Sequence, residues 1–159
     1  MMWLVSVALA DDSMLWRSDL GASLGLVAVR SSTGNHRVDP ALGLWARKGF
    51  GSGFAELELG MATNADLVPG GKLRRNLYRS AVLVGWRGGS RPMHVSLAGG
   101  VAGSTIIGNG VMAFQPGVRL RGDLRVPVGK RSVFVWQSGM TTRGRGADVD
   151  VGIGWGLRW

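Results

Sequence analysis

The chain has 159 residues, of which 27 are glycine and none is cysteine, and its formal net charge is +9. This length fits one domain with a sizeable core. Glycine is costly inside helices, so its abundance favours an all-β protein over a helical one. The lack of cysteine excludes a disulfide scaffold. The basic residues are scattered and form no nucleic-acid-binding motif, so we expect no nucleic-acid partner.

The first ten residues, MMWLVSVALA, are almost entirely apolar. They are too few to cross a membrane as a helix, which takes about 20 residues. They end in Ala-Leu-Ala before two aspartates, the small-x-small pattern of a secretory cleavage site. We therefore interpret residues 1–10 as the remnant of a signal peptide and residues 11–159 as a single domain. The alternative for residues 1–10 is a short apolar strand or a leader.

Beyond this stretch, apolar and polar residues alternate with a period of two in eight segments. Most segments are near the roughly 9–11 residues that a tilted strand needs to cross a bilayer. No helical pattern of comparable strength is present, and short connections between neighbours favour antiparallel up-and-down pairing. The expected strands are 20–30, 37–47, 53–63, 76–87, 93–104, 112–126, 131–141 and 148–159.

The connections between these segments alternate in character. KGFGS, GGSRP and PVGKR are tight, whereas SSTGNH, NADLVPGGKLRR, TIIGNGV and TRGRGA are looser. Transmembrane barrels have short periplasmic turns at one end and longer outer loops at the other. The pattern therefore predicts an eight-stranded antiparallel up-and-down transmembrane β-barrel with both termini on the turn side.

One face of the segments is apolar, and the other collects charged residues and glycine. Periodicity alone does not exclude a soluble β-barrel that binds a small ligand, with the alternation inverted. In a transmembrane barrel, the charged face lines an interior just wide enough for side chains, where arginines and carboxylates must pair. We expect that ion-pair network to plug the lumen, the alternative being a narrow anion-selective pore. Its expected members are Glu56, Glu58, Arg119, Arg121, Asp123, Arg125, Asp148 and Asp150, with Arg47, Arg79, Arg87 and Arg158 on the same face.

Four tryptophans, Trp86, Trp136, Trp155 and Trp159, fall near the tight turns or the C-terminus. Aromatic residues gather at membrane interfaces, so we predict that these four form an aromatic girdle at one rim. Trp45 belongs to the same rim. By parity it shares a face with charged residues, so it either points inward or follows a bulge.

The last segment, DVDVGIGWGLRW, places Val151, Ile153, Trp155, Leu157 and a final Trp159 on one face. This pattern resembles the C-terminal β-signal of bacterial outer-membrane proteins, although glycine replaces the usual polar residue and Trp the commoner Phe. With its eight strands, the chain is similar in plan to small OmpA- or OmpX-like barrels. The resemblance implies the outer membrane of a Gram-negative bacterium as location and the barrel assembly machinery as a partner.

The strongest enzymatic candidate is the pair His94 and Ser96, which share one face of a strand. A base beside a hydroxyl nucleophile suits hydrolysis. The pair resembles the H-x-S motif of the lipid A 3-O-deacylases, which are also eight-stranded outer-membrane barrels. That family needs an acidic partner downstream, and this chain has no glutamate after Glu58. We expect a polar lumen pair in a non-catalytic protein and keep a lipid A-modifying hydrolase as the alternative.

No other chemistry is indicated by the sequence. With two histidines and no cysteine we expect no metal site, and no phosphate-binding or dinucleotide motif points to a cofactor. Lys72, Arg74 and Arg75 are candidates for contact with lipopolysaccharide phosphates. The predicted protein is an integral outer-membrane barrel of structural or surface-interaction type, with membrane lipid and lipopolysaccharide as partners.

Overall fold

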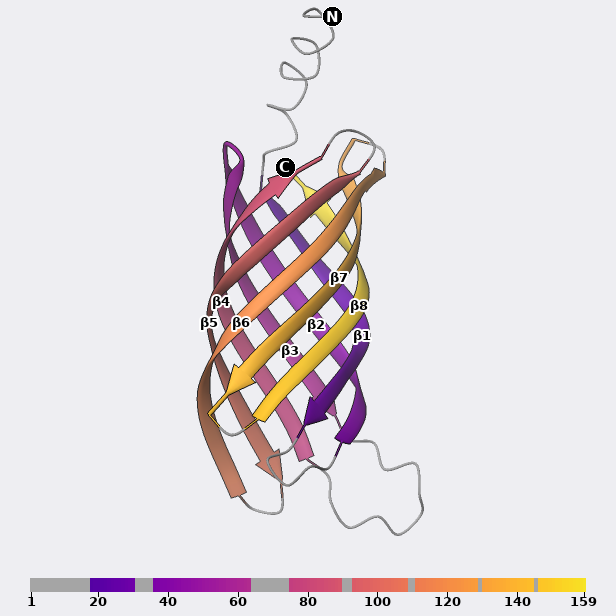
Figure 1. The fold of residues 1–159 in the computed structure, drawn as a ribbon. Coiled ribbons are helices and arrows are strands. Elements are labelled where there is room, and N and C mark those ends of the chain that lie inside the picture. Colours follow the sequence, from indigo (N-terminus) through magenta and orange to yellow (C-terminus); the bar gives the residue numbers. More distant parts are fainter. Residues whose placement is uncertain are drawn as a thin grey trace, which may run out of the picture.

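The computed structural model is an all-β closed barrel of eight strands (Figure 1). It describes residues 18–30, 36–63, 75–89, 93–108, 111–128, 130–144 and 146–159. Among these residues no helix is long and apolar enough to cross a membrane. The strands are β1 (Asp19–Arg30), β2 (His36–Phe50), β3 (Gly53–Thr63), β4 (Arg75–Gly88), β5 (His94–Gly108), β6 (Val111–Val128), β7 (Ser132–Arg143) and β8 (Gly146–Arg158).

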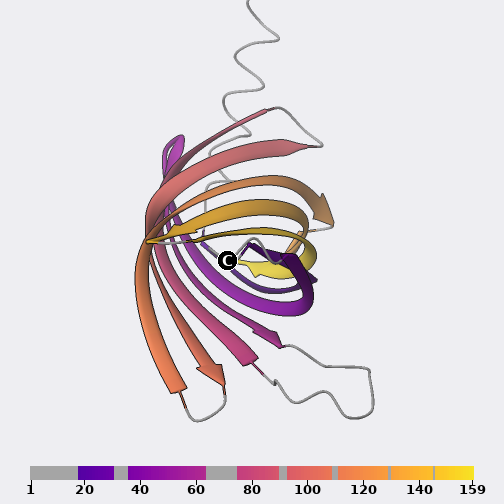
Figure 2. The ribbon, with the colours of Figure 1, turned by 60° about the horizontal axis from the view of Figure 1, so that its bottom comes forward.

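Each strand pairs antiparallel with the next, and β1 pairs with β8 to close the barrel. The closing register runs from Asp19 opposite Arg158 to Arg30 opposite Ala147. Beyond it, the Trp159 backbone N–H donates to the Ser18 carbonyl at 3.1 Å. Figure 2, tilted toward the barrel axis, shows the strands wrapped around a common centre. The predicted fold class and up-and-down topology are confirmed.

The two ends of the barrel differ in their connections. The C-terminus lies at the end that carries the β2–β3 hairpin, which we call the turn end (Figure 1). Gly51 in that hairpin has φ of 61°, the left-handed conformation that a tight hairpin connection needs. The opposite end, which we call the loop end, carries residues 31–35 and 64–74 between strands.

The loop-end connections correct one sequence expectation. Residues 105–111 and 142–147 were expected to be looser loops, yet β5 and β6 leave only residues 109–110 between them, and β7 and β8 leave only 144–145. Antiparallel pairing continues there, as between Thr105 and Phe114. Paired backbone groups satisfy each other's hydrogen bonds, so the ladders extend into segments whose composition suggests loops.

The two faces of the wall have opposite chemistry. The large apolar side chains point outward and remain exposed, for example Leu57 at 49%, Val118 at 54% and Ile153 at 54%. Inward positions carry buried charges, together with apolar residues such as Phe54 and Leu83. The barrel is therefore apolar outside and largely charged inside.

Candidate functional site

The candidate site is the charged interior, and β6 supplies more of its residues than any other strand. Arg119, Arg121, Asp123 and Arg125 occupy alternate positions of this strand, so all four point inward and are buried. β3 places Glu56 and Glu58 inward by the same alternation. These two strands are not neighbours in the sheet, so their side chains meet across the lumen.

Arg119 lies at the centre of the interior. It is 0% exposed. Its guanidinium donates two hydrogen bonds to Glu58, at 2.7 and 2.8 Å, and two to Asp150, at 2.7 and 3.0 Å. A fifth bond, at 3.0 Å, goes to the Thr141 hydroxyl. All five N–H donors of the planar fork are therefore used, which fixes this side chain in one orientation.

Arg79 on β4 completes this central layer. Its guanidinium forms ion pairs with Glu58 at 3.1 Å and with Asp150 at 3.0 Å. Two arginines thus share two carboxylates contributed by different strands. The interior of an eight-stranded barrel is narrow, so side chains from strands that are not paired with each other can meet there. The shared carboxylates therefore link such strands through side-chain ion pairs.

A second layer lies nearer the turn end. Arg47 pairs with Glu56 and with Asp123, each at 2.6 Å, and also donates to the Ser96 hydroxyl at 3.0 Å. Arg125 pairs with Asp123 at 2.7 Å. The strands β2, β3, β5 and β6 therefore meet in this layer.

Asp19 and Arg121 extend and connect the layers. Asp19 accepts from Arg125 and from the Trp45 indole N–H, both at 2.7 Å. Arg121 contacts Glu56 in the second layer and Glu58 in the central one, the latter at 3.4 Å. The two layers therefore form one connected network.

The ion pairs described above join equal numbers of cations and carboxylates. Their members are Arg47, Arg79, Arg119, Arg121 and Arg125 against Asp19, Glu56, Glu58, Asp123 and Asp150. The buried Arg87 lies next to them, since it lines one small cavity together with Asp19 and Arg125. Buried charges are tolerated only when paired and hydrogen-bonded, and this arrangement meets that requirement.

Asp148 has a different partner from the other expected network residues. It is buried and pairs with Arg143 near the loop end. Within the described part of the chain, no hydrogen bond or ion pair joins this pair to the network. The sequence analysis had assigned Arg143 to a loop, which hid this partner because β7 extends to include it.

Trp45 resolves the alternative that the sequence left open. Its side chain is buried and points inward, without a bulge, since β2 and β3 pair in continuous register around it. Glycine makes room for the ring: a Cβ at Gly154 would lie 2.8 Å from it, and one at Gly21 only 2.2 Å. These glycines are required by the close approach of the indole.

Apolar side chains also contribute to the described interior. Towards the turn end, Trp45 packs with Val133 and Val135. Towards the loop end, Val27, Ala62 and Leu77 form a buried cluster, which we call the loop-end cluster. Val29, Ala41 and Ile106 pack against it. Apolar contacts therefore lie on both sides of the central layer.

The pair His94 and Ser96 lies inside the barrel near the turn end, and both residues are buried. The Ser96 hydroxyl donates to Asp123 at 2.5 Å and accepts from Arg47. The only proton of this hydroxyl is thus directed to a carboxylate of the network. The adjoining cavity measures about 30 Å³, close to the volume of one water molecule, and cannot hold an acyl chain.

The four tryptophans of the expected girdle are all exposed on the outer face. Trp86 lies at the turn end of β4, and Tyr78 occupies the same face near the loop end. Their separation along a strand tilted by about 40° corresponds to roughly 20 Å along the barrel axis. That height is near the roughly 25 Å apolar band of transmembrane barrels.

Several expected residues lie outside the described part. Residues 1–10, Lys72 and Arg74 are not described, and only the backbone of Arg75 is, as the first residue of β4. Among the described residues no cluster of three or more histidine, aspartate or glutamate side chains fits a metal ion.

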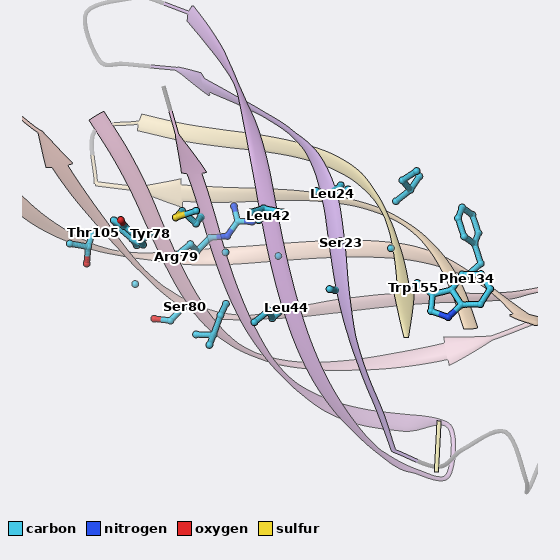
Figure 3. Close-up of a pocket in the computed structure, with 18 residues that line it drawn as sticks. Ser23, Leu24, Leu42, Leu44, Tyr78, Arg79, Ser80, Thr105, Phe134 and Trp155 are labelled. Carbon is cyan, nitrogen blue, oxygen red and sulfur yellow. The ribbon is translucent and has the colours of Figure 1, made fainter. Parts of the chain in front are cut away.

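The outer wall carries a long apolar groove of about 950 Å³ across β1–β5, β7 and β8. Outward side chains such as Leu44, Leu59 and Ser80 form most of its lining. The buried Ser23 and the network residue Arg79 also line it. Figure 3 shows Phe134 and Trp155 together at one end and Tyr78 and Thr105 at the other. Most of the lining of the groove therefore belongs to the outer face of the barrel.

Solved structures match this fold, although no protein-family model and no curated protein matches the chain. Neisserial surface protein A is 11% identical with a TM-score of 0.74, covering 89% of this chain and 97% of its own. Ail of Yersinia pestis, solved with the heparin analogue sucrose octasulfate, is 10% identical with a TM-score of 0.66, covering 90% and 99%. OprG of Pseudomonas aeruginosa is 13% identical with a TM-score of 0.63, covering 91% and 97%. The fold is thus that of the small outer-membrane β-barrels, as the OmpA- or OmpX-like resemblance implied.

Proposed function

We propose that this protein is an integral outer-membrane β-barrel with a structural or surface-interaction role and a closed lumen. One observation carries the proposal: the wall is apolar outside and charged inside. Exposed leucine, valine and isoleucine cover the outer face, while the arginines and carboxylates of the network are buried. In water this arrangement would expose a large apolar surface, whereas in a bilayer the same surface meets acyl chains.

The soluble ligand-binding barrel is disfavoured by the same observation. Such a barrel keeps its apolar residues inside and its charges in water. Here Leu57, Val118 and Ile153 are exposed, and Arg119 and Glu58 are buried. The polarity is therefore the reverse of what a soluble barrel requires.

The pairing and connectivity of the network support the closed lumen. An anion-selective pore needs exposed cations along an open path. In the network five arginines pair with five carboxylates, the loop-end cluster lies to one side of it, and Trp45, Val133 and Val135 pack beside it at the turn end. An ion crossing the barrel would have to break several ion pairs in a low-dielectric interior.

The expected partners belong to the same proposal. The exposed tryptophans Trp86, Trp136, Trp155 and Trp159 are suited to anchor the turn end at the lipid interface. The outward apolar face of β8 is suited to engage the barrel assembly machinery. Lys72, Arg74 and Arg75 are the proposed contacts with lipopolysaccharide phosphates.

The hydrolase alternative has no observation in its favour. Ser96 is engaged by Asp123 and Arg47 inside the barrel. Catalysis on lipid A would require this hydroxyl to reach a substrate at the outer leaflet. The lumen position of Ser96 and the small adjoining cavity disfavour that role.

Two measurements test the proposal. The purified protein should fold only with detergent or lipid, with heat-modifiable gel migration, and a stable monomer in plain buffer would overturn the membrane location. Reconstituted in a planar bilayer, it should give no stepwise ion conductance. Discrete conductance steps from the unaltered protein would overturn the closed lumen while leaving the membrane location intact.

A further inference from the structure

Lys48 is an exception on the outer wall. Among the strand residues whose side chains the structure describes, it is the only charged residue exposed on the outer face. It lies two positions before Phe50 at the turn end of β2. An amine on the lipid-facing wall is tolerated close to the interface, where its cost falls to about 1 kcal/mol or less.

The position of Lys48 coincides with the aromatic rim. Phe50 pairs with Gly53, which in turn pairs with Trp86, so these aromatic side chains belong to the same end of the wall. Phe50 and Trp86 are both exposed. Aromatic rims mark the depth of lipid headgroups, so the Lys48 ammonium lies where phosphates are found.

A hollow of about 380 Å³ adjoins this ammonium. Lys48 and Trp159 line it together with the small side chains Ala46 and Ala55 and the larger Leu57 and Val82. Ala55 is paired directly opposite Lys48. Asp19, Arg47 and Glu56 line it as well, but their charged groups are buried and paired within the network. Lys48 is therefore the exposed cation of the hollow, beside one indole and an apolar outer surface.

The hollow leads toward the long groove of the outer wall. Ala46 and Leu57 line the hollow, and Leu44 and Leu59, two positions further along the same faces of β2 and β3, line the groove. Successive outward residues of a strand are neighbours on its surface. A charged end and a long apolar path thus follow one another down the wall.

We propose that this surface binds one anionic phospholipid, with its phosphate on Lys48 and an acyl chain along the hollow and the groove. The proposal rests on the proposed membrane location. The turn end of such barrels faces the periplasm, so the lipid belongs to the inner leaflet of phospholipid and not to the lipopolysaccharide leaflet. A second copy of the barrel is a less suitable occupant, because it would place another Lys48 or an uncharged outer face against the ammonium. A lipid phosphate carries the opposite charge and complements the ammonium.

Native mass spectrometry of the folded protein, equilibrated with equal amounts of phosphatidylglycerol and phosphatidylethanolamine, tests the site. We expect the protein to retain the anionic lipid with a preference of about fivefold, the size expected for one lysine at an anionic surface. Lys48→Gln should abolish the preference and Lys48→Arg should keep it. Lys130→Gln, at an exposed turn position, is the matched control and should change nothing. Ala55→Phe fills the hollow and should lower the binding of both lipids.

The outcomes separate this inference from the proposed function. Heat-modifiable migration of each variant shows that the barrel is folded. A folded barrel without lipid preference, or Lys48→Gln with the full preference, would overturn the lipid site but not the membrane location. Excess inorganic phosphate should not displace the lipid. If inorganic phosphate displaced the lipid, the site would be one for the free anion, and the proposal would be overturned.

Discussion

The interior of this barrel contains two chemically different kinds of side-chain packing. From the centre to the turn end, a network of five arginines and five carboxylates lies beside the apolar Trp45, Val133 and Val135. Towards the loop end, the loop-end cluster of Val27, Ala62 and Leu77 packs without charged members of its own, near the separate Arg143–Asp148 ion pair. Both regions lie inside the same eight strands and are equally shielded from their surroundings.

The difference shows what each kind of filling demands. Apolar packing is non-directional, so losing part of it costs the buried surface and the cavity that remains. An ion-pair network is directional, and losing one member leaves another charge buried without its partner. The network should therefore respond to charge balance, and the loop-end cluster only to volume.

The largest effect is expected for Arg119→Met. This change removes all five bonds of Arg119 and leaves Glu58 and Asp150 with a deficit of one positive charge. Breaking a buried pair from one side costs about 3–5 kcal/mol. We expect a loss of that size in the free energy of unfolding, measured by urea titration in lipid vesicles with tryptophan fluorescence.

A matched double variant isolates the contribution of charge. Arg119→Met combined with Glu58→Gln restores the balance of the network while removing still more of its ion pairs. We expect the double variant to be more stable than Arg119→Met alone. If it were less stable, the number of contacts and not the balance of charge would determine the stability of the network.

Leu77→Ala tests the other region, with a smaller expected effect of about 2–4 kcal/mol. Leu77 is buried in the loop-end cluster and pairs opposite Ala62. The same unfolding titration should show partial recovery when Ala62→Val is added, because the new methyl groups fill the cavity. Rescue of Leu77→Ala by Glu58→Gln would contradict the separation of the two regions.

The alternation of residues is enough to predict the barrel and most of its inward charges. Glu58, Arg119 and Asp150 fall on the charged face by parity alone, since side chains alternate along a strand. The same rule gave an inward Trp45 as one of two alternatives, the other being a bulge. What parity does not predict is which inward residues meet, because β3 and β6 face each other across the lumen and their relative height depends on the stagger of the closed sheet.

The omissions have similar causes. Asp19 was missed because the first strand was expected to begin one residue later, and Arg143 because its surroundings have the composition of a loop. The sequence around each residue does not show that the neighbouring strand is still paired at that position. A partner across a closed sheet is a property of the whole barrel, so no local pattern identified Gln137 as the acceptor for Arg121 at 2.6 Å.

Ser96→Ala should have the smallest effect and tests both the network and the hydrolase alternative. The hydroxyl bridges Asp123 and Arg47, yet these two residues also pair directly at 2.6 Å. Removing it therefore leaves every charge partnered, and we expect a loss of about 1 kcal/mol, the worth of one hydrogen bond. Lipid A from cells that produce the variant should match, by mass spectrometry, lipid A from cells that produce the unaltered protein. A loss near that of Arg119→Met would show that the bridge is indispensable to the network, and a changed acylation pattern would restore the hydrolase.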